Sequence, residues 1–168
     1  APLQNRTIRV RIPQNLLSSL IIKTTNEDIT LPSLTVTDSV SMYVNHGNIQ
    51  FDTLDAGNAI SLETKNGNIN GTILGSYDDF TIESFAKKGE NSLPESKSGG
   101  NKILKVFTNN GDIQMDIKNK SFNKGNKKES LSLGKALFFH YLISCSIPKN
   151  NGLSKKSVTV ISKPSQIF

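Results

Sequence analysis

The stretch from Val40 to Phe51, VSMYVNHGNIQF, decides the fold, because it holds one complete strand–turn–strand unit. Apolar and polar side chains alternate on both sides of the turn, which is the two-residue period of a half-buried β-strand. Gly47 stands between the two runs and suits a tight turn, because glycine adopts backbone conformations that other residues rarely adopt. The stretch therefore predicts two short strands joined by a corner.

The same unit occurs four times along the chain, as LIIKTTNEDITL (20–31), VSMYVNHGNIQF (40–51), ISLETKNGNING (60–71) and LKVFTNNGDIQM (104–115). The turn position is Glu27, Gly47, Gly67 or Gly111, and an acidic or amide residue follows it in each case: Asp28, Asn48, Asn68 or Asp112. Isoleucine comes next in all four units: Ile29, Ile49, Ile69 and Ile113. Recurrence of one residue type at one phase predicts stacked structural repeats.

A mainly β fold follows, and two architectures suit a repeat of about 20 residues with two strands. The favoured one is a short right-handed parallel β-solenoid of the single-stranded β-helix type, in which each unit is one coil and equivalent strands pair in parallel. The alternative is an antiparallel β meander, in which Asn-Gly forms a hairpin turn and Val44 faces Ile49. The solenoid is favoured because only a stack gives each isoleucine a reason to recur at the same phase.

The domain is predicted to span residues 1–117, beginning with an alternating strand at residues 7–12. The step from Gly67 to Gly111 is about two repeat periods, and the missing unit should lie near Phe80 and Ile82. Residues 86–101 are polar and are interpreted as an inserted surface loop in a degenerate repeat.

Residues 118–168 form a basic C-terminal extension that acts as a cap or remains a tail. The apolar part, residues 136–147, is too short to span a membrane as a helix, which needs about 20 residues. It is interpreted as a capping helix or a buried strand pair over the open end of the solenoid, and Val158 and Val160 suit one last strand. A third interpretation is that this tail does not belong to the normal pattern of the domain.

The repeat resembles that of the adhesin-like domains, a family of domains of unknown function. The residues that carry the resemblance are Pro13, the Asn26-Glu27-Asp28-Ile29 run and the three glycine turns with the two residues that follow each of them. The resemblance covers about residues 6–117, and Glu27 departs from it where the family has glycine. It implies a short β-helix and a binding module on the cell surface or outside the cell.

The charge distribution is uneven, with 8 Lys/Arg against 11 Asp/Glu in residues 1–100 and 12 against 3 in residues 101–168. A basic final third suits contact with nucleic acid or an anionic membrane, but its lysines are scattered and lack interleaved aromatic residues, so a solvated surface is favoured. The N-terminus lacks a signal-peptide pattern, and the single Cys145 excludes an internal disulfide framework. An intracellular location therefore stays as open as a surface one.

Chemical motifs are weak. His46 occupies a turn, His140 and Cys145 lie in the apolar stretch, and their spacing matches no zinc motif. Carboxylates cluster at three places, Asp52/Asp55, Asp78/Asp79 and Asp112/Asp116, where turns and strand ends account for them. Calcium at the stacked turns would need a glycine-rich nonapeptide repeat that the chain lacks.

The sequence therefore predicts no catalytic, cofactor-binding or metal-binding residue. It assigns the repeated positions to structure, with a turn ladder of Asn26, Asp28, Gly47, Asn48, Gly67, Asn68, Gly111 and Asp112 and a core ladder of Ile29, Ile49, Ile69 and Ile113. The leading function is a non-enzymatic scaffold or adhesion-type module with an unknown protein or glycan ligand. The alternatives are an intracellular interaction protein with a basic tail for an anionic partner, and a carbohydrate-active enzyme.

Overall fold

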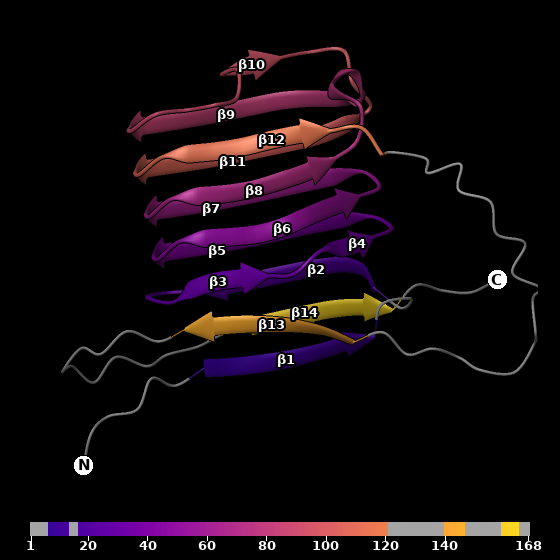
Figure 1. The fold of residues 1–168 in the computed structure, drawn as a ribbon, viewed down its shortest axis with the longest axis vertical. Helices are drawn as coiled ribbons and strands as arrows, with labels where there is room; N and C mark the ends of the chain where they lie inside the picture. The colour runs from indigo at the N-terminus through magenta and orange to yellow at the C-terminus, as the bar shows by residue number, and fades with distance from the viewer. Residues whose placement is uncertain (1–6, 14–16, 121–139, 147–158, 165–168) are drawn as a thin grey trace, which may run out of the picture.

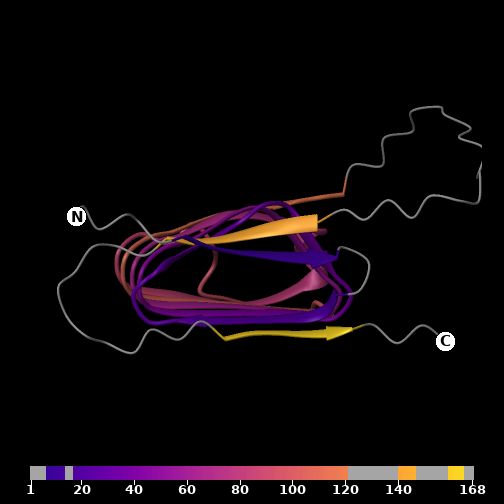
Figure 2. The same cartoon turned by 90° about the horizontal axis from the view of Figure 1, so that it is seen from below.

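The structure, a computed structural model, describes residues 7–13, 17–120, 140–146 and 159–164. It is a β-solenoid of five coils whose strands pair mostly in parallel, as the repeat predicts (Figure 1). Seen along the stack, the coils enclose a flattened core between two facing sheets (Figure 2). The antiparallel meander is wrong, because Ile49 is the parallel partner of Ile69 on the neighbouring strand.

The first sheet, called sheet A, is ordered β1-β13-β3-β6-β8-β12, with β4 also paired to β6. Its strands are β1 (Thr7–Pro13), β3 (Asp28–Leu31), β4 (Leu34–Val36), β6 (Ile49–Ala56), β8 (Ile69–Leu74), β12 (Ile113–Lys118) and β13 (His140–Ser146). The second sheet, called sheet B, is ordered β10-β9-β11-β7-β5-β2-β14. Its strands are β2 (Leu17–Thr24), β5 (Ser39–His46), β7 (Ala59–Asn66), β9 (Phe80–Lys88), β10 (Ser96–Lys97), β11 (Lys102–Asn110) and β14 (Thr159–Pro164).

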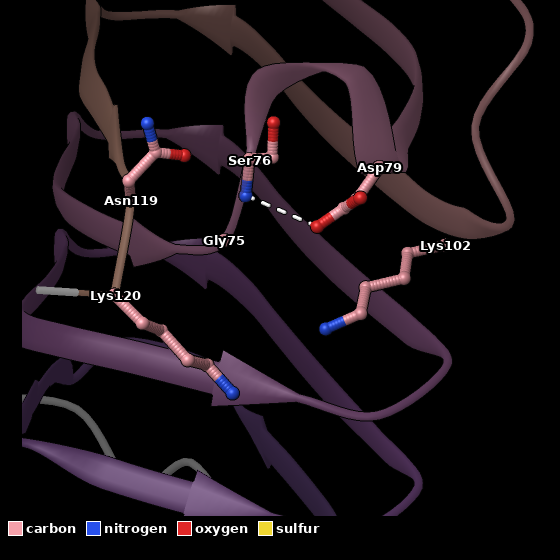
Figure 3. Close-up of a pocket in the computed structure, with 6 residues that line it drawn as sticks. All are labelled: Gly75, Ser76, Asp79, Lys102, Asn119 and Lys120. Atoms are coloured by element: carbon pink, nitrogen blue, oxygen red, sulfur yellow. Dashed lines mark hydrogen bonds between the residues drawn. The ribbon is translucent and has the colours of Figure 1, made fainter. Parts of the chain in front are cut away.

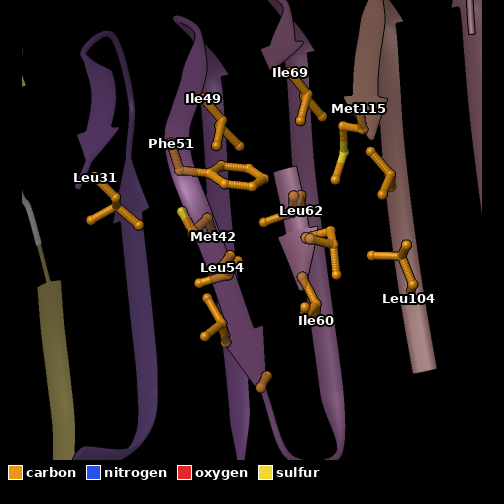
Figure 4. Close-up of a cluster of buried hydrophobic side chains, with 14 of the residues drawn as sticks. Leu31, Met42, Ile49, Phe51, Leu54, Ile60, Leu62, Ile69, Leu104 and Met115 are labelled. Atoms are coloured by element: carbon orange, nitrogen blue, oxygen red, sulfur yellow. The ribbon is translucent and has the colours of Figure 1, made fainter. Parts of the chain in front are cut away.

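The core consists of apolar side chains stacked from coil to coil, because alternate residues of each strand point inward. The four isoleucines of the core ladder are at most 1% exposed, and each lies in register with the next. Figure 4 shows the same stacking for the labelled side chains of sheets A and B. Burial of each such side chain stabilises the fold by about 1.5–3 kcal/mol.

The order of the coils in space differs from their order in the chain. Strand β11 pairs with β7 on one side and with β9 on the other, so Leu104 lies between Ile60 and Ile82. The fifth coil (β11 and β12) is thus inserted between the third coil (β7 and β8) and the fourth. The fourth coil therefore closes one end of the stack (Figure 1).

The prediction of a surface loop over residues 86–101 is wrong for part of this range, because several of these residues belong to the fourth coil. Ala86–Lys88 continues β9, Gly89 forms a corner like those of the other coils, and Asn91 forms a parallel bridge to Ile113. Residues 96–97 then form β10, which pairs antiparallel with β9. The predicted unit near Phe80 and Ile82 is thus present as β9, and its second half departs from the repeat because Asn91 stands where the other coils have isoleucine.

The polar interior of the fourth coil explains its terminal place. Ser84 occupies the position that Val106 holds in the neighbouring strand, and its hydroxyl donates to Pro94 O at 2.8 Å. The Asn91 amide donates to the same hydroxyl at 2.9 Å. Polar residues at this level would interrupt the core of an inner coil, but they suit an end coil, which has one apolar neighbour instead of two.

The opposite end of the stack carries strands from the N-terminus and from the C-terminal extension. Strand β13 pairs antiparallel with both β1 and β3, and β14 pairs antiparallel with β2. A capping helix over His140–Ser146 is therefore wrong, and a strand covers the edge of the first coil, which removes unpaired backbone groups. Residues 121–139 and 147–158, including Val158, lie outside the described residues.

Candidate binding face

The turn ladder lies at one corner of the solenoid and is held by side-chain-to-backbone hydrogen bonds. The backbone N–H of Asn48 donates to Asp28 Oδ1 at 2.6 Å, and that of Asn68 donates to Asn48 Oδ1 at 2.8 Å. The N–H of Asp112 donates to Asn68 Oδ1 at 2.9 Å, and Glu90 continues the ladder onto Asp112. One oxygen of each of these side chains is thus used to join neighbouring coils.

The corner glycines are required by close approach of the backbone. A Cβ at Gly67 would lie 2.0 Å from Gly47 O, and one at Gly111 would lie 2.0 Å from Gly67 O. Glu27 occupies the same place in the first coil, where the described residues include no further corner for its side chain to meet. This position in the stack explains why a side chain is tolerated there.

Asn26, the remaining member of the predicted ladder, has a different role. Its backbone N–H donates to Glu27 Oε2 at 3.1 Å, within the same turn. In two other coils the equivalent residues are Asn66 and Asn110, and their side-chain amides contact each other: Asn110 Nδ2 donates to Asn66 Oδ1 at 2.5 Å.

The three carboxylate clusters do not form an acid–base pair across a cleft. Asp112 belongs to the turn ladder, and Asp116 lies 3.8 Å from Lys118 Nζ on the surface. Asp79 caps its own turn by accepting from Ser76 N at 3.1 Å. The interpretation that turns and strand ends account for these residues agrees with this geometry.

Asp55 is the most buried of these carboxylates and is bound by two lysines. Its Oδ2 lies 2.6 Å from Lys120 Nζ, and its Oδ1 lies 3.9 Å from Lys102 Nζ. Lys102 also donates to Ala56 O at 3.0 Å. A carboxylate held in this way neutralises its neighbours and joins the fifth coil to the second.

A cavity of about 350 Å³ adjoins this ion pair, lined by Gly75, Ser76, Asp79, Lys102, Asn119 and Lys120 (Figure 3). Its two ammonium groups both lie against Asp55, and Asp79 accepts a hydrogen bond from Ser76 N. The charged groups that line the cavity are therefore already partnered within the protein.

The two histidines and the single cysteine lie at separate places in the fold. Among the described residues, no three His, Cys, Asp or Glu side chains lie close enough together to hold a metal ion. His46 ends β5 at an exposed corner, while His140 and Cys145 belong to β13, opposite Pro13 and Ile8 of β1. No helix in the described part of the chain has the length and apolar character needed to cross a membrane.

The outer face of sheet B carries aromatic and charged side chains on neighbouring strands. One row of outward side chains crosses five neighbouring strands in exact register, and it is called the cross-strand row. Its members are Lys23 of β2, Tyr43 of β5, Glu63 of β7, Phe107 of β11 and Phe85 of β9. Phe85 is 49% exposed, although a phenylalanine of this fold normally lies in the core. This row could not be predicted from the sequence, because its aromatic residues become neighbours only through the spatial order of the coils.

A shallow depression of about 300 Å³ lies beside one half of the cross-strand row, over β2, β5 and β7. It is lined by Lys23, Ser41, Met42, Tyr43, Ser61 and Glu63. Ser41 and Ser61 are partners in register, and their small side chains leave the space that the larger row residues border. The Tyr43 hydroxyl donates to Asn45 Oδ1 at 2.7 Å, which fixes the ring on the face.

The comparisons with known proteins add no identity, because no protein-family model, no curated protein and no solved structure matches the chain. The resemblance to adhesin-like domains therefore stays a prediction. So does the proposed contact between the basic C-terminal extension and an anionic partner, since much of that extension lies outside the described residues.

Proposed function

We propose that this protein is a non-enzymatic, adhesion-type binding module that holds a glycan chain on the outer face of sheet B. The observation that carries the proposal is the cross-strand row, in which three aromatic side chains face outward on a flat parallel sheet. The buried positions of the coils are explained by stacking, whereas these outward aromatic side chains are not.

Exposure of large apolar groups supports a binding role for this face. Among the described residues, the exposed large hydrophobic side chains are Tyr77, Phe85 and Ile103, and the last two lie on the outer face of sheet B. The outward positions of sheet A include the polar residues Gln50 on β6, Thr72 on β8 and Gln114 on β12. Exposed apolar groups gathered on one face mark interaction surfaces.

The chemistry of the face suits a sugar. A pyranose ring has an apolar C–H face that packs on an aromatic ring and a rim of hydroxyls that needs hydrogen-bond partners. Tyr43 and Phe107 supply rings, while Ser41, Ser61 and Glu63 supply polar groups in the adjoining depression. This mixture of aromatic and precisely placed polar groups is typical of ligand sites.

The proposal is tested by binding of soluble polysaccharides, with dextran, xylan and polygalacturonate as probes in affinity electrophoresis. Replacement of Tyr43, Phe107 or Phe85 by alanine should weaken retention of a bound polymer at least tenfold. Gln50→Ala and Gln114→Ala on sheet A serve as matched controls and should leave retention unchanged. Retention by no polymer, or retention unaffected by the three aromatic variants, would refute the proposal.

A further inference from the structure

We infer that the glycan held by the cross-strand row is an acidic one, whose carboxylate or sulfate groups are bound by Lys23, Lys65 and Lys87. The inference rests on the proposed function and specifies its ligand. It is argued from the charges that border the row, their separation and the position of Glu63.

On β2, β5, β7, β11 and β9, the outer face of sheet B carries four lysines and two glutamates, which are Lys23, Lys65, Lys87, Lys105, Glu63 and Glu83. Lys105 Nζ lies 2.8 Å from Glu83 Oε2, so this pair is neutral. The other three lysines form no ion pair with any described residue. The face therefore keeps a surplus of positive charge, although residues 1–100 as a whole are acidic.

The strands of the opposite face, sheet A, carry charged residues of both signs. The outward strand positions of sheet A include Asp52 and Asp116, and only Asp116 has a lysine partner there, Lys118 at 3.8 Å. The three lysines without an ion pair lie on the same face as the aromatic side chains, so a polyanion is attracted to the face that carries the cross-strand row. Oriented charge of this kind steers a ligand to one face of a protein.

The free lysines lie along the row at regular positions. Lys23 is the first member of the row and the neighbour of Tyr43 in register. Lys65 and Lys87 come two residues after Glu63 and Phe85 on their own strands, so they share the outer face about 7 Å further along the strand. Neighbouring strands are about 4.8 Å apart. A polymer that lies across the strands along the row therefore passes Lys23 at one end of the row and Lys65 and Lys87 along one side of it.

Glu63 distinguishes an acidic glycan from a nucleic acid. It lies in the middle of the row, between Tyr43 and Phe107, and forms no ion pair among the described residues. A carboxylate at that place accepts hydrogen bonds from sugar hydroxyls, which are plentiful in a glycan. Single-stranded DNA offers a phosphate at every linkage and no sugar hydroxyl, so Glu63 would repel it.

Two matched pairs of polymers test the inference on the full chain: polygalacturonate against its methyl-esterified form, and dextran sulfate against dextran. We expect at least one acidic polymer to bind at least tenfold more tightly than its neutral partner, with affinity falling as salt is raised. Lys23→Gln, Lys65→Gln and Lys87→Gln should each weaken that binding about threefold or more, while Glu63→Gln should strengthen it. Lys118→Gln on sheet A is the control and should have no effect.

The outcomes separate this inference from the proposed function. Binding of a neutral polymer that depends on the aromatic residues but not on the lysines or salt would overturn the acidic ligand and leave the proposed function standing. Failure of both acidic polymers to bind would overturn the inference, as would tighter binding of oligo(dT) than of either polymer. Circular dichroism of each variant establishes that the fold is retained.

Discussion

The ring of Phe51 lies over the bare Cα of Gly71, so a Cβ added to that glycine would stand 2.4 Å from two ring carbons. The two residues belong to neighbouring strands at a bulge, where the register between β6 and β8 shifts between Gln50 and Thr53. In Figure 4 the Phe51 ring points toward the strand that carries Ile69. The missing side chain of Gly71 thus leaves the space that the Phe51 ring occupies in the core.

Gly71→Ala should therefore destabilise the protein by about 1–3 kcal/mol, the usual cost of overpacking a core. Phe51→Leu should cost about 1 kcal/mol alone but should remove most of the penalty of Gly71→Ala when the two are combined. Chemical denaturation of the two single variants and the double variant measures this coupling. Simple additivity of the two changes would show that the ring and the glycine are not in contact.

The corner position gives a matched pair of variants at equivalent places in the repeat. Gly67→Ala places a Cβ against Gly47 O and should destabilise by more than about 2 kcal/mol, because backbone would have to move. Glu27→Ala should change the unfolding free energy by less than about 1 kcal/mol, since it removes one hydrogen bond and also the buried, unpartnered Oε1. Equal costs for the two changes would contradict the assignment of Glu27 to the end of the corner stack.

Because Asp55 forms ion pairs and Asp52 forms none with a described residue, we expect these two aspartates of β6 to contribute differently to the stability of the protein. Asp55→Asn should destabilise by about 1–3 kcal/mol, because the mostly buried ammonium of Lys102 loses its charged partner. Asp52→Asn, at an exposed position of β6, is the control and should stay within about 0.5 kcal/mol of the parent. Lys120→Gln should cost less than Asp55→Asn, since the Lys120 side chain is half exposed. Thermal melts of the three variants decide the ranking.

The inserted coil predicts which engineered cysteines can be joined. In a Cys145→Ser background, Glu63→Cys with Phe107→Cys should oxidise to a disulfide, because the two residues are partners on adjacent strands. Glu63→Cys with Phe85→Cys should not, because β11 lies between β7 and β9. Mass spectrometry under mild oxidation distinguishes the two pairs, and the reverse result would indicate coils stacked in chain order.

The four aligned repeats were predictable because their constraints are local in sequence and repeat in space. Each isoleucine of the core ladder packs on the next, so selection for stacking leaves the same residue at the same phase. The fourth coil obeys the same geometry at Gly89, whose added Cβ would lie 2.0 Å from Gly111 O. Its sequence does not show this, because an end coil needs polar groups such as Asn91 where an inner coil needs isoleucine.

The candidate site was less predictable than the fold for a related reason. Alternation along each strand shows that Phe85 and Phe107 face the same side as the other outward residues, but not which strands are neighbours. Coils in chain order would place Phe85 beside Glu63, whereas the inserted coil places Phe107 there and Phe85 at the end of the row. The order of coils is a global property that depends on which one best tolerates an end position.

The insertion of β11 and β12 has a consequence for how the chain is made. During synthesis the fourth coil emerges before the fifth. The place beside β7, however, is occupied in the structure by β11, which at that moment has not yet been translated. The solenoid therefore cannot add its coils one at a time in the order of synthesis, because β9 can pair with β11 only after β11 has been made. Strand β11 has a neighbour on each side. A further repeat added after β12 could therefore not stack directly on the fifth coil.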